Sequence, residues 1–187
     1  MRATNLFTIA CAVAATCAIS PAAATAAKGT GGAVYGPDDP ALTATVPGDK
    51  AVLQDNGMAA APEAAPEPVK RAVWAANRII GKPYKYGGGH AQVEDDGYDC
   101  SGTISYALLG GRLLDAPLDS SSFMSWGRKG RGRWVTVYTN PGHAYIVIAG
   151  LRLDTSAAGD PSGAKGPRWR PTLRKASGFK TRRLPGL

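Results

Sequence analysis

The chemistry that this sequence could support depends on one cysteine. The chain has three, but Cys11 and Cys17 lie in a leader-like segment, which leaves Cys100 alone in the remainder. A lone thiol in an exported protein is a buried bystander, a link to another chain or a nucleophile. Cys100 follows Asp99, a favourable N-cap, at the start of an expected helix. The amide groups and dipole there favour a thiolate and could hold an oxyanion, although a buried bystander stays open.

A thiolate nucleophile needs a partner that accepts and returns a proton, and imidazole fills this role best near neutral pH. The chain has two histidines. His143 opens an expected strand directly after Asn-Pro-Gly, whereas His90 lies in a glycine-rich loop ten residues before Cys100. We therefore expect His143 to be the base and His90 to be a loop or rim residue.

Asp154 is the expected partner of His143 if their strands form a tight hairpin. A two-residue turn at Ala149-Gly150 or at Gly150-Leu151 would point both side chains to the same face. The first turn makes them diagonal neighbours, about 7–8 Å apart at Cα and within reach, and the second separates them too far. Near Nδ1, Asp154 would fix the imidazole tautomer and stabilise its charged form. The alternative is an aspartate solvated at a strand end.

Helices are expected before strands. Capping residues, proline and glycine place the helices at 67–80, 100–109 and 120–126. Residues rich in β-branched and aromatic side chains predict strands at 133–139, 143–148 and 151–155. Helices followed by consecutive antiparallel strands are typical of an α+β fold.

Three parts are expected along the chain. Residues 1–27 combine a basic start, a short apolar core and an Ala-x-Ala site, which predict a secretory signal peptide, and no other segment could cross a membrane. Residues 28–66 are rich in Ala, Gly and Pro and predict a flexible or extended tether, or alternatively an irregular first layer of the domain. Residues 67–187 are expected to form one catalytic domain, whose tail only Trp169 and Phe179 could anchor.

Composition excludes several kinds of site. Three cysteines and two histidines are too few for a Cys/His zinc site or a multi-disulfide framework. The Gly87-Gly88-Gly89 run lacks the Gly-Lys-Ser/Thr that completes a phosphate loop. We expect this run to let the backbone pass close to the site, and Gly102 to leave open space beside the sulfur.

The net charge of +8 is unevenly distributed, because residues 1–100 carry a net −2 and residues 101–187 a net +10. A basic half in an exported protein suggests anionic partners, such as wall polymers or carboxylate-bearing peptides, although charge for solubility explains any single arginine equally well. The basic run 128–133 could alone indicate nucleic-acid binding. The signal peptide and the lack of interleaved aromatic residues argue against that partner.

Three motifs, in this order, resemble the NlpC/P60 cysteine peptidases, which are bacterial cell-wall endopeptidases with a papain-like α+β fold of N-terminal helices packed on an antiparallel sheet. They are Gly81-Lys-Pro-Tyr84-Lys-Tyr86-Gly-Gly88, Asp99-Cys100-Ser101-Gly102, and Gly142-His143 before a hydrophobic strand. The resemblance covers roughly residues 69–156.

This resemblance implies that Cys100 is the nucleophile and His143 the general base. The third catalytic position falls on Asp154, where the family often has histidine. Tyr84 matches a tyrosine that helps to position substrate or the oxyanion, and Asp99 and Ser101 flank the nucleophile as structural or substrate-contacting residues. Family members commonly cleave the γ-D-glutamyl–diamino acid bond of peptidoglycan stem peptides, and neither a metal nor an organic cofactor is implied.

The sequence therefore predicts a secreted, monomeric cysteine peptidase of the cell wall that acts on peptidoglycan stem peptides. Two other classes stay open. One is a catalytically silent module on the same fold that binds the wall or a partner. The other is a thiol amidase or acyltransferase that acts on another substrate.

Overall fold

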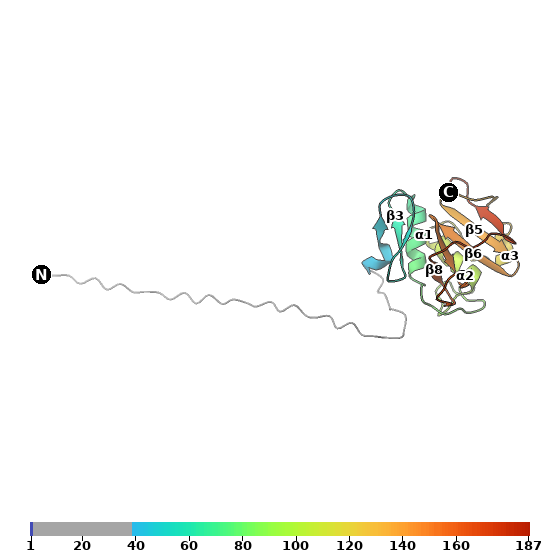
Figure 1. The fold of residues 1–187 in the computed structure, drawn as a ribbon, viewed down its shortest axis with the longest axis horizontal. Helices are drawn as coiled ribbons and strands as arrows, with labels where there is room; N and C mark the ends of the chain where they lie inside the picture. The colour runs from blue at the N-terminus through green and yellow to red at the C-terminus, as the bar shows by residue number, and fades with distance from the viewer. Residues whose placement is uncertain (2–38) are drawn as a thin grey trace. The chain divides into compact units, whose positions relative to one another are not determined.

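The computed structural model describes Met1 and residues 39–187. The expected signal peptide, with Cys11 and Cys17, and the first part of the expected tether lie outside the described residues. The described chain is a mixed helix-and-sheet structure with a three-stranded and a six-stranded sheet (Figure 1). Within this part, no helix is long and apolar enough to cross a membrane.

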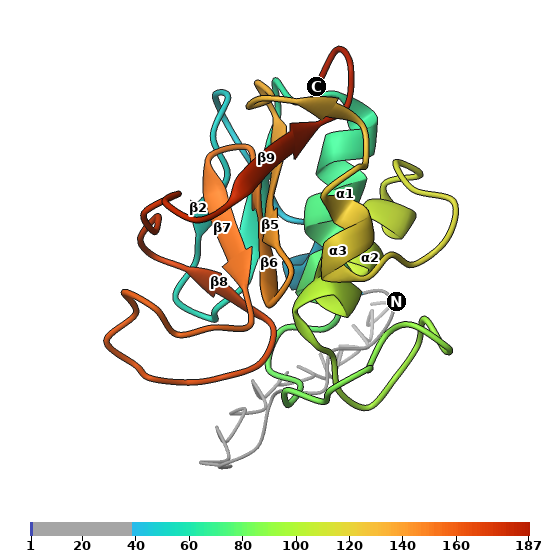
Figure 2. The same cartoon turned by 90° about the vertical axis from the view of Figure 1, so that its right-hand side faces the viewer.

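The six-stranded sheet carries the second half of the domain. Its strand order is β4-β9-β5-β6-β7-β8, and every neighbouring pair is antiparallel. The helices lie on one side of this sheet (Figure 2), and their apolar side chains share one core with those of β5 and β6. The strands are β4 (Arg128–Lys129), β5 (Val135–Asn140), β6 (His143–Ile148), β7 (Leu151–Asp154), β8 (Arg168–Arg170) and β9 (Lys180–Arg183).

Along the chain, three helices follow the strands of the three-stranded sheet and precede those of the six-stranded sheet, as the capping signals predict. They are α1 (Glu67–Asn77), α2 (Cys100–Gly110) and α3 (Ser120–Phe123). In α1, proline in the first turn starts the helix, and apolar residues at helical spacing face the core. In α2, the Asp99 side chain caps the first turn, and the eight residues 101–108 are all buried. The helix that begins at Cys100 is therefore buried along most of its length.

The structure differs from the expected tether over residues 40–62. This segment forms a 3-10 helix, η1 (Pro40–Thr43), and the strands β1 (Thr45–Val46), β2 (Val52–Leu53) and β3 (Ala59–Pro62), with β3 in the middle of the sheet. The segment is thus the first layer of the domain. Ala59 and Ala61 are fully buried in the same core as α1. Small side chains let β3 pack closely against α1, although a run of alanines shows no hydrophobic periodicity.

Asn77, the last residue of α1, joins three distant segments through one buried side-chain amide. Its Nδ2 donates to the carbonyl oxygens of Leu42 and Ala59, both at 2.9 Å. Its Oδ1 accepts from the Ala59 backbone N–H at 2.9 Å and from Trp169 Nε1 at 2.8 Å. The expected anchoring role of Trp169 is confirmed, since this indole is buried and fixes β8 to α1 and β3.

Candidate functional site

A tight β6–β7 hairpin brings His143 and Asp154 together. Ile148 pairs with Leu151 and Ile146 with Leu153, so the turn is Ala149-Gly150. Both turn residues have positive φ, 47° and 84°, as a two-residue hairpin turn requires. Continuing this register places Asp154 diagonal to His143, which is the closer of the two arrangements that the sequence allowed.

The imidazole of His143 contacts the carboxylate directly. Its Nε2 lies 2.9 Å from Asp154 Oδ1, and this carboxylate is completely buried. The Ser156 backbone N–H donates to Oδ1 at 2.8 Å, and Arg174 Nη1 donates to Oδ2 at 3.1 Å. The sequence-based expectation placed the aspartate at Nδ1, whereas in the structure Asp154 contacts Nε2.

The surroundings of His143 hold its ring in the protonated form. Burial opposes that charge, but hydrogen bonds to Asp154 and Cys100, together with their negative charge, outweigh burial and raise the pKa of His143 to about 9. Burial likewise works against ionisation of Asp154, yet the hydrogen bond from His143 prevails and lowers the pKa of the carboxyl below its usual value. Asp154 engages Nε2, and Cys100 is the other group whose hydrogen bond and negative charge raise the pKa of this imidazole. The imidazole thus bridges Cys100 and Asp154.

Cys100 is a free, half-buried thiol at the first residue of α2. The amides of Cys100 and Ser101 are in the first turn, where a helix offers them no acceptor. Gly102 does not leave open space, contrary to expectation, because a Cβ there would lie 2.0 Å from the Gly88 carbonyl oxygen. The glycine loop therefore packs directly against the start of α2, and any side chain at Gly102 would displace it.

Asp99 and Ser101 hold this junction together. Asp99 Oδ1 accepts from the Gly102 backbone N–H at 2.7 Å and from Ser101 Oγ at 3.1 Å, and Oδ2 accepts from the Gly87 N–H at 3.0 Å. Both side chains are buried. Their bonds run to the glycine loop and to the start of the helix.

His90 belongs to the same junction. Its Nε2 lies 3.0 Å from Asp99 Oδ1 and 3.3 Å from Ser101 Oγ. The sequence predicts only a loop or rim residue at His90. The structure gives it an aspartate at almost the same distance as that of His143, and only the fold could reveal this second pair.

A pocket of about 240 Å³ opens beside His143. It is lined by Tyr84, His143, Thr155, Ser156, Ala157 and Lys165. Tyr84 is half exposed, and burial together with the negative charge of Cys100 and Asp99 raises the pKa of its phenol. The phenol is therefore close enough to the thiol to sense its charge, so the structure brings Tyr84, Cys100, His143 and Asp154 into one site.

Two residues of the tail complete the site, and one of them escaped the sequence analysis. Phe179 packs edge-on against the rings of His143 and Tyr145, with centroids 6.3 and 5.1 Å away. The Arg174 guanidinium, which also bonds Asp154, lies 5.2 Å from the Tyr145 ring and 5.1 Å from Phe179. Phe179 was expected to anchor the tail, whereas nothing distinguished Arg174 from the other arginines of this basic half.

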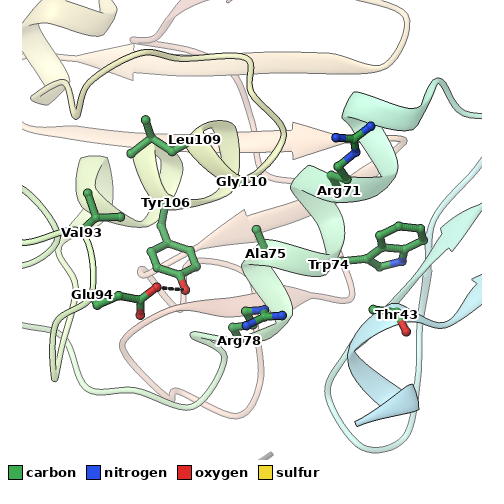
Figure 3. A pocket seen from close by; sticks show the side chains of 10 residues that line it. All are labelled: Thr43, Arg71, Trp74, Ala75, Arg78, Val93, Glu94, Tyr106, Leu109 and Gly110. Carbon is green, nitrogen blue, oxygen red and sulfur yellow. Dashed lines mark hydrogen bonds between the residues drawn. The ribbon is translucent and has the colours of Figure 1, made fainter. Parts of the chain in front are cut away.

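A second hollow, of about 370 Å³, lies between α1 and α2 (Figure 3). Trp74 of α1 and Arg78, which follows this helix, line one part of it, and the hydrogen-bonded pair Tyr106–Glu94 lines another. It includes none of the residues that converge on Cys100. Within residues 39–187, no group of three or more His, Cys, Asp or Glu side chains is placed to hold a metal ion.

Comparison with known proteins finds similar solved structures. No protein-family model matches the chain, and no curated protein matches it. The peptidoglycan hydrolase RipB from Mycobacterium tuberculosis is 23% identical, with a TM-score of 0.47, over 63% of this chain and 64% of that chain. The match therefore spans less than two thirds of the RipB chain.

Proposed function

We propose that this chain is a cysteine peptidase of the NlpC/P60 type that hydrolyses amide bonds in peptidoglycan stem peptides. The observation that carries the proposal is the line of contacts from a free thiol at a helix start, through one imidazole, to a buried carboxylate. Nucleophile, base and orienting group in hydrogen-bond reach are the arrangement that thiol-dependent acyl transfer needs.

The first half of the reaction makes a thioester. The thiol proton already resides on His143, whose pKa is raised to about 9, and the Cys100 thiolate attacks the amide carbonyl carbon to give a tetrahedral oxyanion. The first-turn amides of α2 and the Tyr84 hydroxyl are the donors available to this oxyanion. The carbon–nitrogen bond then breaks as His143 passes its proton to the leaving amine. Asp154 holds the ring in place and balances its charge throughout.

The second half releases the acyl group. Water replaces the amine in the pocket, and His143 takes a proton from it as the oxygen attacks the thioester carbon. The carbon–sulfur bond breaks, the carboxylic acid product leaves, and the proton from water stays on His143, which restores the pair of thiolate and imidazolium. No oxidation or reduction occurs, and the Cys100 thiol, the His143 imidazole and the attacking water account for every proton.

The motifs around Cys100 and His143 support a wall peptide as substrate. By the resemblance, the bond is the γ-D-glutamyl–diamino acid bond. The expected signal peptide supports secretion and action at the cell wall. The net +10 of residues 101–187 is suited to a wall that carries anionic polymers.

Digestion of purified peptidoglycan, followed by mass spectrometry of the soluble products, tests the proposal. The mature protein should release stem-peptide fragments with a new amino terminus at the diamino acid, and Cys100→Ala should release none. Circular dichroism should show both proteins equally folded. Release of the same fragments by Cys100→Ala would refute the mechanism, and glycan-strand products would refute the bond type.

Iodoacetamide labelling separates this enzyme from a catalytically silent binding module. An activated Cys100 should react quickly even below pH 7, and His143→Gln should slow the reaction. A thiol that reacts slowly in both proteins would favour the silent module.

A further inference from the structure

The pocket beside His143 contains a cation that the proposed mechanism does not use. Lys165 is exposed and lines this pocket together with His143 and Tyr84. Among the described residues, no hydrogen bond or salt bridge engages its ammonium group, and no acidic residue lines the pocket. A lysine lining a pocket in this way is available to an anionic group of a ligand.

The backbone on both sides of Lys165 is fixed by a fully buried arginine. Arg170 Nη2 donates to the carbonyl oxygens of Ala164 at 2.9 Å and Gly166 at 3.4 Å, and its Nη1 contacts Asp160 Oδ2 at 2.5 Å. The Gly166 N–H also donates to the Thr155 carbonyl at 3.0 Å. These bonds attach Ala164 and Gly166, the two neighbours of Lys165, to Arg170 of β8 and to Thr155, which lines the pocket.

Close packing at Gly166 adds to this hold. Its φ is +92°, and a Cβ there would lie 2.4 Å from the Lys82 carbonyl oxygen, just before Tyr84 in the chain. The backbone of the loop that carries Lys165 therefore packs directly against the backbone of the segment that carries Tyr84. The two walls of the pocket keep a fixed relation, and the lysine starts from a defined place beside the imidazole.

The size and charge of the pocket define what it accepts. At about 240 Å³ it is smaller than the roughly 300 Å³ at which pockets for whole small ligands begin, so it takes one part of a larger substrate. Its ionisable lining is Lys165, the His143 imidazole, whose pKa is raised to about 9, and the Tyr84 phenol. This balance favours a carboxylate over a neutral amide or an ammonium group.

We propose that Lys165 is a specificity-determining residue that binds a substrate carboxylate next to the scissile amide. The inference rests on the proposed function and adds the chemical class of group that the pocket selects. In a stem peptide, two carboxylates flank the expected bond: one on the γ-linked glutamyl residue and one on the diamino acid. Replacing the selected carboxylate by a carboxamide removes the charge and keeps the shape.

Hydrolysis of three synthetic stem peptides tests the proposal: one with both carboxylates, and two with a single carboxamide at one or the other position. The intact protein should cleave one of the amidated peptides with a kcat/KM about 10- to 100-fold lower than that of the unmodified peptide, as expected for one hydrogen bond between charged groups. Lys165→Gln should cleave the two at nearly equal rates. Lys165→Arg should keep most of the preference.

A matched control removes the same charge elsewhere. Lys129 lies in β4, which contributes no residue to the pocket lining. The Lys129→Gln variant should therefore discriminate between the peptides as the unmodified protein does. Equal loss of discrimination in Lys129→Gln and Lys165→Gln would overturn the proposal, because net charge alone would then explain it. Unchanged discrimination in Lys165→Gln would overturn it as well.

Binding measured without turnover keeps this inference separate from the proposed function. Isothermal titration of the three peptides into Cys100→Ala should show the same preference, and it should vanish in the double variant with Lys165→Gln. If the unmodified protein cleaves no peptide but Cys100→Ala binds with this preference, the hydrolase proposal fails and the carboxylate site stands. If cleavage proceeds with no preference among the three, the site fails and the hydrolase stands.

Discussion

The domain contains two histidine–aspartate pairs with nearly the same contact and very different surroundings. His143 Nε2 lies 2.9 Å from Asp154, and His90 Nε2 lies 3.0 Å from Asp99. Asp99 divides its oxygens among the start of α2, Ser101 and the glycine loop. Apart from one backbone N–H, the other partners of the Asp154 carboxylate are the imidazole and two arginines, Arg174 at 3.1 Å and the buried Arg152 at 3.9 Å. A short His–Asp distance therefore does not define a catalytic pair; the other bonds of the carboxylate do.

The position of each pair relative to the thiol completes the contrast. Asp154 lies behind His143, so the ring is between the carboxylate and Cys100 and can move a proton to the thiol's substrate. In the other pair the carboxylate itself caps the helix that begins with Cys100, and the ring contacts this carboxylate and the Ser101 hydroxyl. One pair is arranged to act on protons, and the other is arranged to hold a loop to a helix.

The largest expected effect separates the two histidines. His143→Gln should reduce kcat on a stem peptide by on the order of 10³-fold or more, because no other described side chain takes its place at the thiol. His90→Gln should stay within about tenfold of the unmodified protein. Steady-state kinetics on one peptide measure both. Comparable losses in the two variants would break the distinction drawn between the pairs.

A somewhat smaller effect separates the two aspartates. Asp154→Asn should lower kcat on the order of 100-fold, because the ring loses the charge that keeps it protonated. Asp99→Ala should act mainly on stability, with a loss of about 1–2 kcal/mol from the missing N-cap. Kinetics and urea unfolding on both variants give the two readouts. An unchanged kcat in Asp154→Asn would contradict this prediction. The relative size of the two unfolding defects would not, because Asp154→Asn can also lower stability.

The pH dependence of stability should report His143. Its folded pKa, about 9, is higher than the ordinary value of 6.5, so the imidazolium stabilises the folded state fully below pH 6.5 and loses this contribution as pH rises to about 9. The difference in unfolding free energy between the unmodified protein and His143→Gln should therefore shrink across this range. In Asp154→Asn, an NMR titration should find the His143 pKa moved down. A stability difference that grows with pH would contradict the assignment.

The smallest expected effect is at Arg174, which touches Asp154 but not the thiol. Arg174→Gln should lower kcat by less than about tenfold, because Ser156 and His143 still hold the carboxylate. The pH–rate profile should shift with it, which a purely structural role would not cause. Arg128→Gln, an exposed residue of β4, removes the same charge and should change neither quantity.

Much of the site could be predicted from local rules. The N-cap at Asp99 placed Cys100 at a helix start, and the strand alternation placed His143 and Asp154 on one face. Both depend on neighbours in sequence or on one tight hairpin, which short-range chemistry determines. The choice between two hairpin registers, however, needed the fold.

The features that could not be predicted depend on contacts over long distances in the chain. The His90–Asp99 pair depends on how the glycine loop turns back onto α2. The space at Gly102 is filled by the Gly88 carbonyl, which no periodicity indicates. The burial of Arg170 behind Lys165 requires a folded loop to provide its acceptors, because a charged side chain is expected at the surface. The alanines of β3 carried too weak a pattern to predict a strand.

The amide of Asn77 also determines when the domain can be completed. Its hydrogen bonds connect residues 35 positions earlier and 92 positions later in the chain, and closing loops of such length is slow compared with forming α1 or the β6–β7 hairpin. The junction therefore forms only after Trp169 has been synthesised. Until then the layer before α1 and the strand β8 have no common attachment. Quenching or a spectral shift of the Trp169 indole during refolding would time this last step.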